Sequence, residues 1–333
     1  MCPVRMAVVC AFGATALWGL AFVAPELVAT DGTELALGRY LVFGLSSVLV
    51  LAARGFVAVR DLRARDWRRI ILLGLLGNSL FYSLISAGIV SAGSVPVALV
   101  FAVLPLMMAA VGNVRRPVFR WRSVLGPFLL VAAGLAVNAA TALAGDLAVL
   151  GPRPVLGLVL AVLALLSWLV YGIWNSEYLH DRPLTSSVSW ASLTGLGTLI
   201  TLPAILAVDV LVRGGIDLPA AGDLPALVAW SIVLGIGASW VATWLWARAS
   251  MSLGASVLGL LIVTEAVFAV LYSCLVDRRL PSPVESLTAA LTIGGVAWGL
   301  VSIMRARARA RGRVAAARPR PHDHDPRLTT PDR

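Results

Sequence analysis

The chain has 333 residues, of which 59% are hydrophobic and 13% are charged, and its mean hydropathy is +0.89. This balance excludes an ordinary soluble protein, because too few polar residues remain to cover a surface in water. The formal net charge is +10, and all 27 basic residues are arginine, so a retinal receptor is also excluded because it needs a Schiff-base lysine.

Ten apolar segments of about 20 residues follow one another with short polar interruptions. About 20 apolar residues in a helix cross the hydrocarbon core of a bilayer, and a spanning segment must be helical to satisfy its own backbone. The sequence therefore predicts an all-α polytopic membrane protein. The ten predicted spans are Met6–Val28, Glu34–Ala53, Ile70–Val90, Val95–Val114, Val124–Leu143, Leu156–Tyr178, Val188–Leu211, Leu224–Trp246, Ala255–Val276 and Leu287–Met304.

The arginines of the short loops predict the orientation of the chain, since cytoplasmic loops carry the excess of positive charge. With the N-terminus inside, thirteen arginines before the tail lie on the cytoplasmic side and four on the outer side. We therefore expect a multi-pass protein of the inner (plasma) membrane with both termini in the cytoplasm. The cytoplasmic set is Arg5, Arg54, Arg60, Arg63, Arg65, Arg68, Arg69, Arg115, Arg116, Arg120, Arg122, Arg182 and Arg248; the outer set is Arg153, Arg213, Arg278 and Arg279.

Residues 305–333 are expected to form an Arg-rich, disordered cytoplasmic tail. Arginines occupy alternate positions from Arg305 to Arg313, directly after the last span. Anionic headgroups attract such residues by about 1 kcal/mol each. The positive charge therefore predicts anionic lipids at the cytoplasmic face as partners, and no nucleic acid.

Glycines of the first half recur in the second half at one fixed separation of 161 residues. Each half holds five spans, and because five is odd, the second copy must cross the membrane in the opposite direction. Residues 1–144 and 145–304 are thus predicted to be two inverted five-helix repeats, an architecture typical of secondary transporters. Duplication for stability alone is the alternative. The pairs are Gly74 with Gly235, Gly93 with Gly254, and Gly134 with Gly295.

Short motifs occur in order along nearly the whole chain. They are Ala16-Leu17-Trp18-Gly19, Gly38-Arg39-Tyr40-Leu41, Leu104-Pro105-Leu106, Thr264-Glu265-Ala266-Val267-Phe268-Ala269, Asp277-Arg278-Arg279-Leu280 and Gly294-Gly295. With these motifs the chain resembles the EamA-type members of the drug/metabolite transporter superfamily. The resemblance implies a carrier of small organic metabolites such as amino acids or related compounds, and it implies export.

The ninth span departs from the family pattern. Family members usually carry proline after the glutamate of this span, and here Ala266 follows Glu265. Pro105 keeps the equivalent feature in the fourth span. Because proline removes a helical hydrogen bond and clashes with the preceding turn, Pro105 predicts a kink in the fourth span, and the sequence leaves a kink in the ninth span open.

Glu265 is the deepest charged group of the predicted spans, about 15 Å from each surface at 1.5 Å per residue. A charge at that depth costs roughly 2.5–3.5 kcal/mol on insertion scales, and burial there favours the neutral carboxyl. Glu265 is therefore either a proton carrier coupled to transport or a hydrogen-bonded group that ties helices together.

Glu26 and Arg39 are both predicted near the outer ends of their spans, where they can form an ion pair. One interpretation is an outer gate. The other is that Arg39 receives a substrate carboxylate. Both can hold in an exporter whose pair breaks as the outer side opens.

Aromatic and amide side chains recur at helical spacing on other spans, so that pairs share a face. Rings with polar edges suit a cavity for organic solutes, and helix packing is the alternative. The candidate substrate or coupling-ion residues are Asn78, Tyr82, Trp18, Trp168, Tyr171, Asn175, Trp240 and Trp244, together with Glu265.

The spans contain no histidine and no facing pair of aspartates. We therefore expect no enzyme activity, no catalytic residue, no metal and no cofactor. The predicted function is secondary transport by alternating access, with proton coupling through Glu265 as a hypothesis. A passive channel or a structural membrane subunit is the alternative. Oligomeric state is left open by the sequence, with a homodimer as one option.

Overall fold

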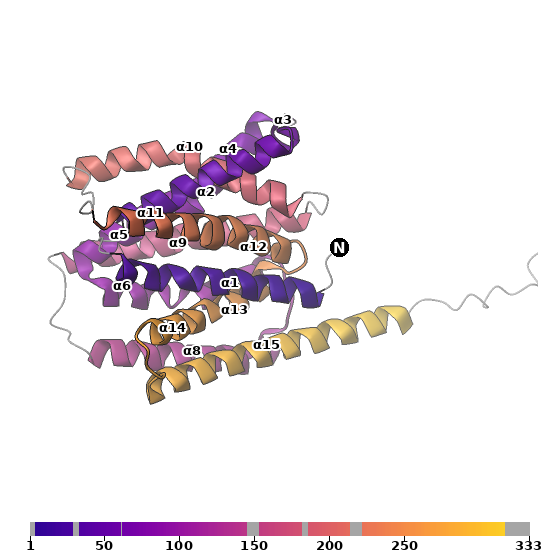
Figure 1. Cartoon of the computed structure of the whole chain (residues 1–333). Helices are drawn as coiled ribbons and strands as arrows, with labels where there is room; N and C mark the ends of the chain where they lie inside the picture. The colour runs from indigo at the N-terminus through magenta and orange to yellow at the C-terminus, as the bar shows by residue number, and fades with distance from the viewer. Residues whose placement is uncertain are drawn as a thin grey trace, which may run out of the picture.

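The computed structural model describes residues 4–28, 33–60, 62–144, 153–181, 186–213 and 222–316, and within these ranges every regular element is a helix (Figure 1). The helices of the first half are α1 (Val4–Leu27), α2 (Thr33–Ala53), α3 (Val57–Arg60), α4 (Ala64–Gly74), the π-helix η1 (Leu75–Ser79), α5 (Leu80–Ala92), α6 (Ser94–Phe101), α7 (Leu104–Arg115) and α8 (Trp121–Ala144). Those of the second half are α9 (Pro154–Asp181), α10 (Ser187–Arg213), α11 (Leu224–Val233), the π-helix η2 (Leu234–Val241), α12 (Ala242–Ser250), α13 (Ala255–Ile262), α14 (Thr264–Val276) and α15 (Pro283–Ala316).

Among the described residues, eight helical stretches are long and apolar enough to cross a membrane. The all-helical membrane architecture predicted from hydropathy is therefore confirmed. Two of the ten predicted spans are not in this group. The fourth is divided between α6 and α7, and the fifth contributes the shorter apolar helix Val124–Val137.

The surface between the helix ends is apolar, as expected for contact with lipid. Leu49, Leu129 and Leu275 are each more than 60% exposed. Soluble monomers rarely expose large contiguous apolar areas. These leucines therefore fit a bundle whose outer face meets hydrocarbon.

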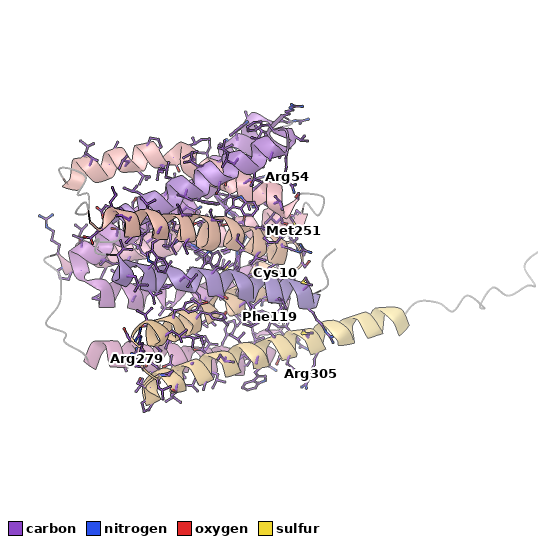
Figure 2. The ribbon with its side chains drawn as sticks, in the orientation of Figure 1. Cys10, Arg54, Phe119, Met251, Arg279 and Arg305 are labelled. Carbon is purple, nitrogen blue, oxygen red and sulfur yellow. The ribbon has the colours of Figure 1, made fainter. Side chains whose placement is uncertain are left out.

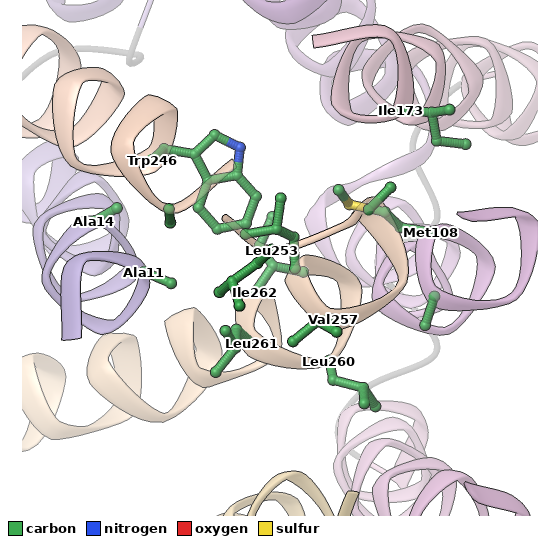
Figure 3. Close-up of a cluster of buried hydrophobic side chains, with 14 of the residues drawn as sticks. Ala11, Ala14, Met108, Ile173, Trp246, Leu253, Val257, Leu260, Leu261 and Ile262 are labelled. Atoms are coloured by element: carbon green, nitrogen blue, oxygen red, sulfur yellow. The ribbon is translucent and has the colours of Figure 1, made fainter. Parts of the chain in front are cut away.

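The core lies where α1, α7, α12 and α13 meet. Trp246 of α12 is fully buried and lies between Ala11 and Ala14 of α1 and the leucines of α13 and of the turn before it, including Leu253 and Leu261 (Figure 3). The two alanines allow α1 to approach closely enough for the indole ring to fill the gap.

Helix interruptions occur at related places in the two halves. The π-helix η2 begins 159 residues after η1, in the eighth and third predicted spans respectively. The break before α14 falls at Val263, which is 161 residues after Ala102 in the break before α7. Pro105 explains the first-half break because it cannot continue the helical hydrogen bonding.

The ninth span, whose kink the sequence left open, is interrupted at Val263 without a proline. The Thr264 hydroxyl donates to the Leu261 carbonyl oxygen over 2.7 Å and lies 2.9 Å from the Thr15 hydroxyl of α1. A threonine that bonds back to its own helix bends that helix. The contact with α1 thus holds a break that local sequence does not predict.

Two of the repeated glycine pairs make reciprocal contacts between the halves. A Cβ at Gly74 would lie 2.5 Å from the backbone nitrogen of Thr198 in α10, and one at Gly235 would lie 2.6 Å from Val42 of α2. Gly134 of α8 packs in the same close manner on α15, and Gly295 of α15 packs on α8. Helix backbones approach closely at all four positions because no side chain intervenes.

The N-terminal end of α1 and the C-terminal end of α15 lie at the same end of the bundle (Figure 1). Arg54 and Arg305 mark this Arg-rich end, and Arg279 lies at the opposite end (Figure 2). The tail was expected to be disordered from residue 305, but α15 continues as a helix to Ala316. Alternating alanine and arginine favour this extension, since both are strong helix formers. Residues 317–333 lie outside the described residues.

Candidate substrate site

Arg39 joins α2 to the π-helix η2. Its Nε donates a hydrogen bond to the Ser239 Oγ over 2.7 Å, and its Nη2 donates to the Ala238 carbonyl oxygen over 3.0 Å. The wider turn of a π-helix separates backbone groups from their usual α-helical partners, which gives Arg39 access to this carbonyl. The partly buried guanidinium thus has the polar partners that a charge within a membrane protein needs.

Glu265 is the second residue of α14 and directly follows the break at Val263. Its side chain is partly buried and lies within electrostatic range of the Arg39 guanidinium. The first turn of a helix also carries a partial positive charge that favours a carboxylate. Among the described residues, its carboxylate has no hydrogen bond or ion pair, so it is available to a proton or a solute.

The structure therefore brings Arg39 towards Glu265, a relationship that the sequence did not predict. The side chain of Glu26 lies outside the described residues, although its backbone belongs to α1. The predicted Glu26–Arg39 gate stays a prediction.

Three of the predicted aromatic residues form one cluster between α1 and α9. The ring of Trp18 lies 6.3 Å from that of Trp168, edge to face, and Trp168 lies 5.7 Å from Tyr171. Trp246 extends the cluster, with its ring 5.0 Å from Trp18. Trp246 was not predicted as a site residue, because it lies at the predicted end of its span and its partner is far away in sequence. The Tyr171 ring also packs against Gly77 of η1.

A second group of predicted residues faces α10. The Trp240 Nε1 donates to the Ser192 Oγ over 3.2 Å, and the Trp240 ring stacks on Trp244 at 6.4 Å. The Asn78 Nδ2 donates to the Thr198 Oγ1 over 3.0 Å. These polar groups hold helices together in this conformation.

The remaining predicted residues have different surroundings. Tyr82 meets Tyr40 of α2 edge to face at 6.0 Å. Asn175 is buried, and its Oδ1 accepts a hydrogen bond from the Trp190 indole over 2.7 Å. Tyr40, which sequence reasoning missed, lies beside Arg39, whose guanidinium carbon is 5.5 Å from the Tyr40 ring centre.

A small cavity lies between α2, α5 and α10. Its volume is about 20 Å³, and its walls include Tyr40, Ser79 and Tyr82. Such a volume holds about one water molecule. The aromatic and polar side chains therefore fill this region in the present conformation, and an open substrate cavity there requires the helices to separate.

Comparisons with known proteins agree with this architecture. Residues 5–139 match the model of the EamA-like transporter family. The inner membrane protein YtfF of Escherichia coli (strain K12) is 28% identical over 294 residues, which cover 84% of this chain and 90% of YtfF. A solved crystal structure matches with a TM-score of 0.70 at 19% identity and covers 90% of this chain and 98% of its own. At that identity, the likeness to the crystal structure concerns the fold alone.

Proposed function

We propose that the chain exports small organic metabolites as a secondary transporter, because residues 5–139 match the EamA-like transporter family and most of the chain is similar to an inner membrane protein of Escherichia coli. The similarity to an inner membrane protein and the eight apolar helices among the described residues support a multi-pass protein of the inner membrane. The proposed substrates are amino acids or related compounds. The proposed mechanism is alternating access between inverted five-helix halves, with both termini in the cytoplasm.

The observation that carries the mechanism is the reciprocal packing of the repeated glycines. Gly74 meets α10, the second helix of the second half, whereas Gly235 meets α2, the second helix of the first half. The matching interruptions of the helices support the same relation. Two inverted copies of one unit can exchange conformations at similar energy, which is the condition for opening to either side in turn.

The proposed inner latch between the halves lies at the ends of α7 and α9. The Arg115 Nε lies 2.6 Å from a Glu177 oxygen, and Arg116 lies 2.6 Å from Asp181, each pair with two hydrogen bonds. The hydrogen bond to Asp181 raises the pKa of Arg116 above its ordinary value, so Arg116 keeps its charge. Exposed pairs contribute about 0–1 kcal/mol. The latch can therefore break at low cost during each cycle.

Export is tested by comparing metabolites in cells with and without the protein, followed by uptake into inside-out vesicles. The expected result is intracellular accumulation of one compound in the deletion strain, and saturable uptake of that compound by vesicles that contain the protein. Flux that rises linearly with concentration identifies a passive channel. No flux for any accumulated compound favours a structural subunit.

Proton coupling is tested with Glu265→Gln, because glutamine keeps the size of the side chain and cannot release a proton. In inside-out vesicles with an acidified lumen, the wild-type protein should concentrate substrate and the variant should not. Glu285→Gln is the matched control, since Glu285 pairs with Arg279 at the opposite end from the Arg-rich loops. An unchanged rate and pH profile in Glu265→Gln rejects the proton role.

A further inference from the structure

A cavity of about 780 Å³ opens between the Arg-rich helix α4 and the C-terminal end of α9. This volume is within the range of sites for small molecules, about 300–1,000 Å³. One wall is a face of α4 with Arg65, Arg68 and Arg69, and the other is the last two turns of α9. The three arginines share that face because residues three and four apart are neighbours on a helix.

The charges in this cavity do not cancel. Its two carboxylates, Glu177 and Asp181, are each bound in a two-hydrogen-bond pair, by Arg115 at the end of α7 and by Arg116 directly after it. The three arginines of α4 have no carboxylate partner among the described residues. The cavity wall therefore carries a net positive charge that an anion can neutralise.

The position of Arg69 is fixed before any ligand arrives. Its guanidinium carbon lies 4.7 Å from the ring centre of Tyr178, and Tyr178 stacks on the buried Trp190 at 4.5 Å. A cation held over an aromatic face loses less freedom on binding an anion. Arg69 is therefore a preorganised contact rather than a free surface side chain.

The inner part of the cavity is apolar. Leu72 and Leu73 continue the arginine face of α4, and Trp174 of α9 is 46% exposed opposite them. An indole ring exposed beside arginines offers contact area to an apolar body while the charges hold its anionic group.

We propose that this cavity binds an organic anion, with a carboxylate or phosphate group on the arginines of α4 and an apolar body against Trp174. The same chemistry occurs in free metabolites and in lipid headgroups with their acyl chains. A role in capturing transport substrates rests on the proposed function, whereas binding itself does not.

The test is equilibrium binding of radiolabelled benzoate to the full chain in phosphatidylcholine nanodiscs, with no gradient imposed. We expect saturable binding that benzylamine, the same ring with a positive charge, does not displace. Losing one charge-assisted hydrogen bond costs roughly tenfold in affinity, so Arg65→Gln/Arg68→Gln/Arg69→Gln should weaken binding by at least about that factor. If the triple variant does not fold, Arg68→Gln alone replaces it and should also weaken benzoate binding. Trp174→Ala should also weaken binding.

The matched control is Arg54→Gln/Arg60→Gln/Arg122→Gln, which removes three exposed arginines that lie outside the cavity. Absence of saturable binding, or equal weakening by the control, overturns the inference. Phosphatidylglycerol in the nanodiscs separates the two sources: loss of benzoate binding identifies a lipid headgroup as the occupant, and unchanged binding identifies a free solute. Benzoate binding together with no transport of any metabolite that accumulates in the deletion strain keeps this inference and rejects the proposed function. Saturable transport of such a metabolite without benzoate binding does the reverse.

Discussion

The indole nitrogen of Trp190 donates a hydrogen bond to the Oδ1 of Asn175 over 2.7 Å, and each residue is 2% exposed. This bond connects α9 to α10. Because Tyr178 stacks on the same indole, the bond also supports the wall of the α4–α9 cavity. Asn175 therefore acts on the position of other side chains in this conformation, and direct contact with substrate would require the bond to break.

Replacing Asn175 by alanine should lower the stability of the protein while leaving the KM for substrate unchanged. The change leaves the buried Trp190 N–H without its acceptor, at a cost of about 1–3 kcal/mol. Chemical unfolding in detergent micelles measures the loss. Adding Trp190→Phe to Asn175→Ala should cost less than the sum of the two single changes, since the unsatisfied donor is removed. A raised KM with unchanged stability would instead place Asn175 in contact with substrate.

Replacing Arg39 by lysine should reduce transport although the charge is kept. Lysine lacks the planar fork that reaches the Ser239 hydroxyl and the Ala238 carbonyl together. Losing one such bond should lower the transport rate by about tenfold. Ser239→Ala should have an effect in the same direction, measured as the initial rate of vesicle uptake. Arg54→Lys is the control, because Arg54 is exposed just after α2. Normal transport by Arg39→Lys would show that the fork is not needed.

The helical membrane fold could be predicted from hydropathy, because twenty apolar residues in a bilayer have one way to satisfy their backbone. The breaks could be predicted only where their cause is local. Pro105 predicts the division of the fourth span. The break at Val263 instead depends on a contact between Thr264 and Thr15, which are 249 residues apart in the sequence. The π-helix η2 packs against α2, and η1 packs against α10, so their partners lie outside any short window of sequence.

The candidate site could be predicted only in part, because sequence spacing relates residues on one helix and not residues on different helices. Helical spacing identifies the shared face of Trp168 and Tyr171, and in the structure their rings lie 5.7 Å apart. The neighbouring ring of Trp18, from another helix, was not predicted to join them. Spacing cannot identify partners from other helices, so Trp246 and Tyr40 were missed. It also cannot distinguish a polar group that awaits substrate from one already bonded to a neighbouring helix, as Asn78 is to Thr198.

Two glycines of η2 should respond in opposite ways to alanine. At Gly235 a Cβ would lie 2.6 Å from Val42 and 2.8 Å from the Arg39 carbonyl oxygen, so Gly235→Ala forces α2 and η2 apart. Overpacking of this kind costs about 1–3 kcal/mol. At Gly237 the nearest atom, from Leu17, would be 4.0 Å away, and alanine gains up to about 1 kcal/mol of helix propensity. The midpoint temperature of thermal unfolding in detergent should therefore fall for Gly235→Ala and not for Gly237→Ala. Equal effects would reject close contact between η2 and α2.

The ion pair between Arg115 and Glu177 should bias the protein towards the conformation closed at the Arg-rich end. Arg115→Glu and Glu177→Arg each replace attraction by repulsion, and the double swap restores opposite charges. For a pair this exposed, about 0.2–1 kcal/mol is at stake, which corresponds to a change of up to about fivefold in the ratio of the two conformations. Spin labels at the exposed positions Val114 and His180, in a variant without its native cysteines, report the separation of α7 and α9. Each single variant should lengthen this distance, and the double swap should return it towards the starting value. If the distance between the spin labels is as long in the double swap as in the single variants, the pair does not latch these helices.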